Sequence, residues 1–288
     1  NYTSNNDLDN ILSCLKEKYS IELICRKSFK KFNYLISEKF NFCKINNIKE
    51  KNINILMISI TLFNFISLIK LVFLGKKLKG FVFLRSDGFL EYKIRYGIVG
   101  YYFYYFMFFI IKKKLKVLSV SKSFTHVKTK NILHPSELTN TWLKKKINKS
   151  KFKTDFLYIG RFKKEKGAHY LIKIFKENFN QYKLTIVGTE KRYIPKKFHN
   201  NNIKFINPIN NTKKLIKLFD STRIFILPSY TEGFPKVISE SLARLKPIII
   251  FTEIKHVLNN RKGIFVCKRE NKNIREMINL IFKNYEKI

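Results

Sequence analysis

The sequence is poor in acidic residues, with 20 Asp and Glu against 58 Lys and Arg and a formal net charge of +38. This imbalance excludes an acidic, solvating tail and leaves three anionic partners to weigh: nucleic acid, a membrane surface and a phosphorylated small molecule. The excess runs through both halves of a chain rich in Asn, Ile, Phe and Lys. An ordinary solvated basic surface therefore stays open as the alternative.

The sequence also lacks the marks of several protein classes. It has four cysteines without a C-x-x-C pair or zinc-ligand spacing, which predicts reduced thiols rather than a disulfide scaffold or a zinc site. No stretch has the form of a secretory signal, so we expect a cytoplasmic protein. No helix-turn-helix, zinc-finger or RNP-like pattern is present, which argues against specific nucleic-acid binding.

Two apolar stretches stand out in the first half. Residues 53–74 are long enough for a membrane span, but their polar interruptions predict a buried helix followed by a strand at 80–84. Residues 98–111 are apolar on all sides and precede Lys112-Lys113-Lys114. A helix of this kind is buried or contacts lipid, and its tyrosines and flanking lysines suit an anionic membrane interface. Burial inside the first domain is the competing interpretation.

The chain divides into two predicted domains. A helix capped by Asp7 or Asp9 and a strand at 21–25 resemble a βαβ unit whose opening strand would lie before Asn1. The basic stretch at 144–153 separates residues 1–145, an acceptor-side domain, from residues 150–288. We expect both domains to be Rossmann-like and to belong to the α/β class.

The second half alternates between strand and helix patterns, which predicts a doubly wound parallel sheet with its ligand at the carboxyl ends of the strands. The predicted strands are 156–159, 183–187, 203–206, 224–227, 247–251 and 263–266, and the predicted helices are 167–177, 212–219, 235–244 and 273–285.

Two of the loops in this half carry chemistry. The loop G-R-F-K-K-E-K-G at 160–167 follows a strand and holds Arg161 and Lys166 beside a helix start, which suits a diphosphate; a solvated basic loop is the alternative. The segment E-G-F-P-K-V-I-S-E begins at Glu232 and ends at Glu240. These two carboxylates are about 12 Å apart along a helix, too far for a glycosidase pair but suited to two ends of a hydroxyl-bearing ligand.

Both segments resemble motifs of the "glycosyl transferases group 1" family of retaining GT-B glycosyltransferases, whose E-x7-E segment matches residues 232–240. The diphosphate loop of that family matches residues 160–167, about 65 residues upstream. The resemblance covers about residues 153–288 and implies a GT-B fold, in which two Rossmann-like domains face a cleft. It implies a retaining hexosyltransferase that needs no metal or other cofactor and acts in the synthesis of cell-surface polysaccharide or lipopolysaccharide.

The resemblance also implies roles for individual residues. Arg161 and Lys166 would hold the diphosphate of a nucleotide-sugar donor, with Gly160 and Pro235 shaping the two loops. Glu240 would accept hydrogen bonds from the ribose, while Glu232 and the N–H groups of Gly233 and Phe234 would hold the donor sugar. The acceptor would be a glycan or a lipid-linked precursor at the cytoplasmic face of a membrane.

The acceptor side matches the family less well. Many relatives place a His after the strand that ends near residue 84, where this sequence has Arg85-Ser86-Asp87-Gly88. We therefore consider Asp87, His126 and His134 as candidates for that side of the cleft.

Two rival interpretations remain open. A metal-dependent transferase of the other major fold needs a D-x-D pair, and the only one, at 7–9, is explained by helix capping. A catalytically degenerate relative that still binds a sugar nucleotide is the second alternative.

Overall fold

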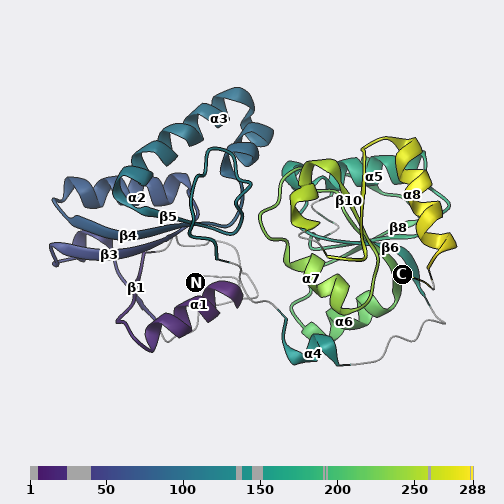
Figure 1. Ribbon diagram of the computed structural model, residues 1–288, viewed down its shortest axis with the longest axis horizontal. Helices are drawn as coiled ribbons and strands as arrows, with labels where there is room; N and C mark the ends of the chain where they lie inside the picture. The colour runs from purple at the N-terminus through teal and green to yellow at the C-terminus, as the bar shows by residue number, and fades with distance from the viewer. Residues whose placement is uncertain are drawn as a thin grey trace.

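The computed structural model describes residues 6–24, 40–133, 138–144, 152–190, 192, 194–258, 261–285 and 287, with side chains from residue 11 onward. It forms two α/β domains that lie side by side, as Figure 1 shows. Over the described residues, one six-stranded sheet forms the second domain and one three-stranded sheet forms the first, which also carries a short two-stranded pair, β1 (Glu22–Leu23) with β2 (Asn41–Phe42).

The second domain is a parallel sheet in the order β11-β10-β9-β6-β7-β8. Its central strands are short runs of Ile, Leu and Phe that are buried on both faces, as expected for a parallel sheet covered by helices. The strands are β6 (Thr154–Ile159), β7 (Leu184–Val187), β8 (Ile203–Ile206), β9 (Thr222–Leu227), β10 (Ile248–Phe251) and β11 (Ile264–Cys267).

The helices of this domain confirm the predicted alternation, with ends that differ by at most two residues. Amphipathic helices bury one apolar stripe on the sheet, for example through Leu171 and Phe175 of α5 and Ile274 and Ile278 of α8. The helical segments are η2 (Lys164–Lys166), α5 (Ala168–Glu177), η4 (Lys196–Phe198), α6 (Thr212–Asp220), α7 (Lys236–Ala243), η5 (Thr252–Leu258) and α8 (Asn271–Lys283).

The first domain corrects one prediction. Residues 53–74 are not a single buried helix: they hold β3 (Asn52–Ile58) and then α2 (Leu62–Phe73). Exposed and partly buried positions alternate along β3, so Asn54 marks the outer face of a strand. The chain then turns at Ser59, where φ is +63°, and Thr61 caps α2 by accepting a hydrogen bond from the Asn64 N–H.

β3 pairs in parallel with β4 (Lys77–Leu84), which pairs in turn with β5 (Lys116–Ser119). The predicted strand at 80–84 is therefore present, and an isolated bridge joins Ser119 at the end of β5 to Ile132. At the start of the chain, α1 (Asn6–Lys16) has Asp7 and Asp9 inside its first turn rather than before it. A short 3₁₀ turn, η1 (Ile45–Asn47), leads into β3.

The helix α3 (Gly88–Lys114) is longer than predicted and kinks at Gly97, whose φ of +69° is non-helical. Met107 and Ile111 are fully buried in the core of the first domain, whereas the opposite face of the helix is exposed. It is the one described helix that is long and apolar enough to cross a membrane.

The junction between the domains is described only in part. The predicted boundary at 145–150 and the candidate His134 lie outside the described residues. Just before it, α4 (Asn140–Leu143) places Trp142 in the core of the second domain. Arg244 donates hydrogen bonds to the Trp142 and Lys144 carbonyls, both 3.0 Å long, so α4 is bound to the second domain.

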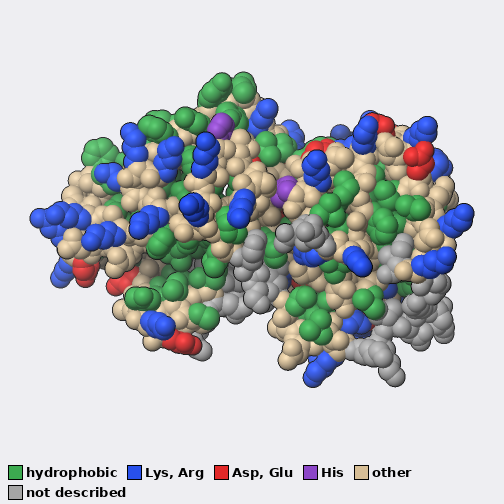
Figure 2. Space-filling model, in the orientation of Figure 1, with side chains coloured by type: hydrophobic (Ala, Val, Ile, Leu, Met, Phe, Trp, Pro, Cys, Tyr) green, Lys and Arg blue, Asp and Glu red, His purple; other side chains and the backbone are tan. Residues whose placement is uncertain are grey.

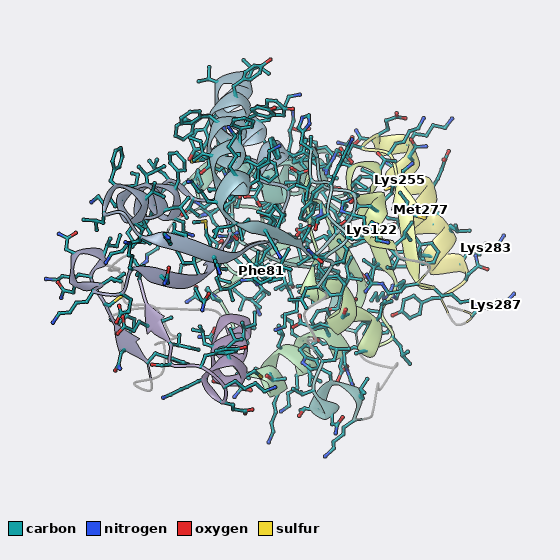
Figure 3. All side chains as sticks on the ribbon, turned by 60° about the vertical axis from the view of Figure 1, so that its left-hand side comes forward. Phe81, Lys122, Lys255, Met277, Lys283 and Lys287 are labelled. Carbon is teal, nitrogen blue, oxygen red and sulfur yellow. The ribbon has the colours of Figure 1, made fainter. Side chains whose placement is uncertain are left out.

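The lysine excess lies largely on the outside of both domains, where Lys and Arg side chains are spread over the visible face (Figure 2). Lys255, Lys283 and Lys287 of the second domain are exposed and project outward (Figure 3). Much of the charge is therefore solvated, as the simplest interpretation of the composition expects.

Candidate functional site

A cavity of about 640 Å³ lies between the two domains. The second domain contributes the loops after β6 and β9, at the carboxyl ends of central strands, and the start of α7. The first domain contributes the ends of β3 and β4 and one side of α3. Predicted residues among the lining are Gly160, Arg161, Lys166, Glu232, Phe234 and Pro235.

The loop after β6 holds Arg161 and Lys166 at one end of this cavity. Tyr158 donates a hydrogen bond of 3.2 Å from its hydroxyl to the Arg161 carbonyl, and burial raises the pKa of that hydroxyl well above its usual range. Gly167 has a φ of +69°, and a Cβ there would lie 1.9 Å from the Pro228 carbonyl oxygen. Only glycine permits this approach, which brings the Arg161–Lys166 loop against the loop after β9.

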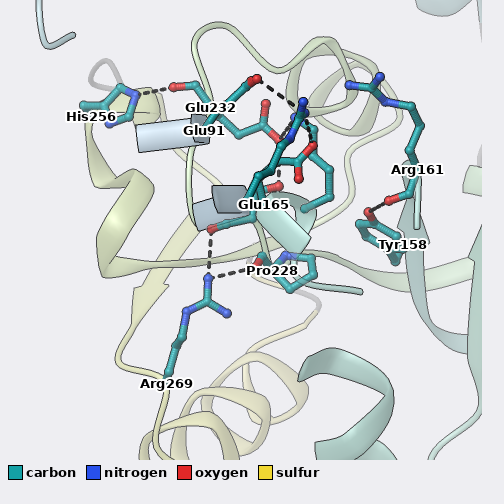
Figure 4. Close-up of polar contacts among 11 residues, drawn as sticks. Glu91, Tyr158, Arg161, Glu165, Pro228, Glu232, His256 and Arg269 are labelled. Atoms are coloured by element: carbon teal, nitrogen blue, oxygen red, sulfur yellow. Dashed lines mark hydrogen bonds and ion pairs between the residues drawn. The ribbon is translucent and has the colours of Figure 1, made fainter. Parts of the chain in front are cut away.

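Lys166 and Glu232 form an ion pair across these two loops. The Lys166 Nζ lies 2.8 Å from the Glu232 Oε1, which also accepts a hydrogen bond of 2.6 Å from the Ser229 hydroxyl. Glu232 is only 8% exposed, and His256 Nε2 lies 2.9 Å from its backbone carbonyl oxygen (Figure 4). The residue expected to bind the diphosphate, Lys166, and the residue expected to bind the sugar, Glu232, are thus in direct contact.

Gly233 brings this loop against the first domain. A Cβ on Gly233 would lie 2.3 Å from the Arg85 carbonyl oxygen and within 3 Å of Val120 and Phe124. Any larger residue would push the domains apart, so the close approach explains a glycine at this position. Gly233 does not itself line the cavity.

A second ion pair crosses the cavity, and no pattern in the sequence predicted it. Arg95 of α3 binds the Glu165 carboxylate of the second domain and also lies 3.4 Å from Glu91 (Figure 4). Burial opposes ionisation of Glu165, but the hydrogen bond and charge of Arg95 outweigh it and lower the pKa of that carboxyl. The same contact raises the pKa of Arg95. Glu165 stands inside the predicted diphosphate loop, yet its partner is 70 residues away.

Arg269, which was also missed, holds the loop after β9 in place. Its Nη2 donates hydrogen bonds of 2.8 Å to the carbonyls of Pro228 and Ser229, and its guanidinium stacks 3.9 Å from the Tyr230 ring centroid. An Arg two residues after the last strand of the sheet, β11, was the available signal. Its action on the site is indirect, through the backbone that positions Glu232.

Besides Gly233, three predicted residues among those described do not reach the cavity. Glu240 is buried on α7 and is not among the described lining residues. Asp87 is 4% exposed and caps α3: one carboxylate oxygen accepts from the Phe89 and Leu90 N–H groups, and the other accepts from Thr125. His126 contacts the Tyr101 hydroxyl and packs against Phe89, away from the lining. Asp87 and His126 therefore have structural surroundings.

Positive charge dominates the cavity wall, which carries five cationic side chains, those of Arg85, Arg95, Arg161, Lys166 and Lys236, against the two carboxylates of Glu91 and Glu232. Such a wall favours an anionic ligand, because opposite charges in a partly enclosed site attract more strongly than in bulk water. Arg161 and Lys166 can bind a diphosphate, and Glu232 can accept hydrogen bonds from hydroxyl groups.

Comparisons with known proteins agree with this geometry. An uncharacterized glycosyltransferase of Haemophilus influenzae is 30% identical over 160 residues, which are 52% of this chain and 44% of that protein. The capsular polysaccharide biosynthesis glycosyltransferase CapM of Staphylococcus aureus is 30% identical over 135 residues, covering 42% and 34%. The chain therefore matches less than half the length of either relative.

Solved structures share the two-domain fold at low identity. WaaG, a glycosyltransferase involved in lipopolysaccharide biosynthesis, is 14% identical with a TM-score of 0.62 and 95% and 86% coverage of the two chains. Anabaena HepE, solved with UDP, is 16% identical with a TM-score of 0.57 and 81% and 70% coverage. These neighbours confirm the expected GT-B arrangement of two α/β domains. The model of the glycosyl transferases group 1 matches residues 140–287, and the chain belongs to that family.

Proposed function

We propose that this chain is a retaining hexosyltransferase that moves a sugar from a nucleoside-diphosphate sugar to a glycan or lipid-linked acceptor. The reaction would take place in the cytoplasm, without a metal ion, during synthesis of a cell-surface polysaccharide. The observation that carries the proposal is the contact of Lys166 with Glu232, beside Arg161, in a basic cavity between two domains. The capsular and lipopolysaccharide roles of CapM and WaaG, and the UDP bound to HepE, support the substrate class.

In the proposed reaction, the bond between the anomeric carbon and the diphosphate oxygen breaks, and the electron pair leaves with the diphosphate. The acceptor hydroxyl forms the new bond on the same face of the sugar, and its proton passes to the leaving diphosphate. Arg161 and Lys166 stabilise the negative charge that develops on the leaving group. Glu232 would release part of its contact with Lys166 and accept hydrogen bonds from the sugar.

Glu240 needs a different position to act as proposed. Its carboxylate is buried on α7. We propose that a bound nucleoside reaches the Glu240 carboxylate after a side-chain or α7 adjustment, so that Glu240 still accepts from the ribose. Gly160 and Pro235 would then limit the width of the nucleotide-binding space, because both line the cavity.

The first experiment is a thermal-shift panel of UDP-, GDP-, ADP- and CMP-sugars on the purified protein. A ligand that binds only the folded state raises its stability, by about 2.7 kcal/mol at a hundred times its dissociation constant. We expect one nucleotide class to raise the melting temperature. No shift with any nucleotide would contradict the proposal.

The second experiment compares Lys166→Ala with Lys163→Ala in a donor-turnover assay. Lys166 lines the cavity, whereas Lys163 is exposed and does not. Loss of one group that stabilises the charge of the transition state costs about 2.7–4 kcal/mol, or 100- to 1000-fold in kcat. Equal losses in both variants would show that overall charge matters rather than a site. Retained turnover in excess chelator would support the metal-free reaction, and slow donor hydrolysis alone would identify a degenerate relative.

A further inference from the structure

The outer face of α3 is an aromatic surface that the transfer reaction does not use. Val99 is 75% exposed and Tyr102 64%, and Phe103, Tyr105, Phe106 and Phe109 are exposed with them. We propose that this face docks on an anionic lipid surface with α3 lying in the plane of the membrane interface. We call these six residues the aromatic face.

The arrangement of the face is typical of an interfacial helix. Tyrosine rings are favoured at the headgroup level because the ring is apolar and the hydroxyl stays in water, and phenylalanine is typical of the apolar face of an interfacial helix. Large exposed apolar patches on a folded protein mark sites that bind another protein or a membrane. Figure 2 shows hydrophobic side chains along the upper edge of the first domain, in the region of α3.

Charge selects the partner. The aromatic face ends in Lys112, Lys113 and Lys114, all exposed, and the Nζ atoms of Lys112 and Lys113 lie 5.5 and 4.2 Å from the Phe109 ring centroid. Residues 52–119 contain eleven Lys and Arg but only two acids, of which Asp87 is buried and Glu91 faces the cavity. An anionic lipid surface complements this charge, whereas a second copy of a chain of net charge +38 is repelled by it.

The helix lies on the membrane rather than crossing it. Its opposite face is part of the first-domain core, since Met107 and Ile111 are fully buried there. The apolar stretch after the Gly97 kink, residues 98–111, is about 21 Å long, which is shorter than the roughly 30 Å hydrocarbon core of a bilayer. Leu62, Ile66 and Phe73 of α2 are also exposed, and α2 contacts α3 through Phe65 and Phe106.

Docking would place the cavity beside the lipid. The first part of the same helix lines the cavity with Glu91, Tyr92 and Arg95, a few turns from the aromatic face. The two helical parts that meet at the Gly97 kink would therefore join the acceptor side of the site to the membrane. That step rests on the proposed function and favours a membrane-held acceptor, whereas docking itself does not depend on catalysis.

The test is flotation of the full chain with vesicles of phosphatidylcholine alone or with 30 mol% phosphatidylglycerol. We expect binding only with the anionic lipid, decreasing with salt. Because each lysine near the surface contributes about 1 kcal/mol, replacing Lys112, Lys113 and Lys114 by Gln is expected to weaken binding on the order of 10- to 100-fold. The matched control replaces Lys213, Lys214 and Lys217 of α6, which are exposed in the second domain and carry the same charge.

A double variant and a control test the apolar side chains of the aromatic face. Val99→Asn with Tyr102→Asn removes the two most exposed members of the face and is expected to reduce binding at least fivefold; Leu280→Asn, an exposed apolar position on α8, is the control. Absence of vesicle binding, or equal loss in the two lysine triples, overturns the proposal. A dimer in vesicle-free solution that Val99→Asn with Tyr102→Asn dissociates, without vesicle binding, would assign the face to a second copy instead. Donor-induced thermal shifts, measured on the same samples, separate a failure of docking from a failure of the proposed function.

Discussion

The two domains differ in how completely they bury apolar side chains. Among the described residues, the second domain with its bound helix α4 has three exposed large hydrophobic side chains, Leu143, Leu245 and Leu280, whereas α3 alone carries eight in the first. The second domain closes a six-stranded sheet with helices, and its central strands are almost wholly buried. The first has a three-stranded sheet whose longest helix is buried on one face only.

This difference separates two tasks. The residues proposed to bind the donor, Arg161, Lys166 and Glu232, stand on loops of the closed domain, where a rigid core fixes their positions. The first domain supplies the other wall of the cavity and an apolar outer face. The second domain, which has the more completely buried core, carries the residues proposed to bind the donor. The first domain, which has the exposed apolar face, is the one proposed to dock on a lipid surface.

The largest predicted effect tests how much the buried contacts of the second domain contribute to its stability. Arg244 is 2% exposed. Its guanidinium forms two hydrogen bonds to the Asp220 carboxylate, 2.7 and 2.9 Å long, and two to the carbonyls of Trp142 in α4 and Lys144 just after it. Arg244→Met leaves these acceptors unpaired, which costs about 3–5 kcal/mol when a buried pair is broken. Trp142, the only tryptophan, lies in this core, so its fluorescence during denaturant unfolding reports the loss.

Arg275→Met is the matched control for that experiment. Its guanidinium makes one long bond of 3.3 Å to the Asn178 carbonyl on the surface of α8. Surface substitutions of this kind usually change stability by less than about 1 kcal/mol. Equal destabilisation by the two variants would show that Arg244 does not hold α4 on the second domain.

The next effect concerns Lys246, the one buried lysine among the described residues of that domain. Burial lowers the pKa of Lys246 to about 8, against the opposing charge of Asp220. Between this pKa and the ordinary value near 10.5, the unfolded chain holds a proton that the folded chain has lost, so this group makes the free energy of unfolding rise with pH. Lys246→Met should therefore raise stability at pH 7 by about 2–3 kcal/mol and abolish that rise.

The measurement is the difference in unfolding free energy between wild type and Lys246→Met at pH 7 and pH 9.5. Lys213→Met, at an exposed lysine of α6, controls for the loss of one charge. A difference that stays constant with pH would mean that Lys246 is not titrating in the folded domain.

The same contrast explains what the sequence predicted well. In the second domain each strand is a short apolar run bounded by Gly, Pro or polar residues, so the local pattern and the buried sheet agree. The prediction of one helix over residues 53–74 was wrong because β3 and α2 follow each other there without Gly or Pro between them. The turn between them depends on a positive φ at Ser59. Residues 98–111 of α3 are apolar on every side of the helix, so the sequence pattern did not show which side is buried in the core and which is exposed.

The sequence predicted the site residues that lie in local loop motifs, but not those that are brought together by contacts between distant parts of the chain. Arg161, Lys166 and Glu232 follow strand ends in recognisable segments, and they line one cavity. Arg95 and Glu165 are 70 residues apart and lie on different domains, and no local pattern links them. The polar residue Asp87 looked functional because capping and catalysis use the same carboxylate chemistry.

A smaller effect separates the two glutamates of the closed domain. Glu240→Gln should weaken both the free nucleoside diphosphate and the sugar nucleotide, because a charge-assisted bond to the ribose is worth about 1.5–3 kcal/mol. Glu232→Gln should lower turnover and leave binding of the free nucleoside diphosphate nearly unchanged, since the proposed contact of Glu232 is with the sugar and exists only when the sugar is present. Calorimetric titration of both variants with both ligands makes the comparison. Equal weakening of the bare nucleoside diphosphate would show that our placement of the donor is wrong.

The smallest effect tests the contact between the domains themselves. Arg95 of the first domain binds Glu165 of the second, and its side chain is 30% exposed, so solvent screens the pair. The measured coupling in a double-mutant cycle of Arg95→Gln and Glu165→Gln should be about 1 kcal/mol, visible as roughly a fivefold change in kcat/KM at low salt. It should shrink in 0.5 M salt, while Trp142 unfolding, which reports the second domain alone, is unchanged by Arg95→Gln. Arg192→Gln, which removes a pair confined to the second-domain surface with Glu190, should leave kcat/KM unaltered. A coupling that is zero at low salt would mean that the two domains approach each other without help from this pair, through the close contact at Gly233 instead.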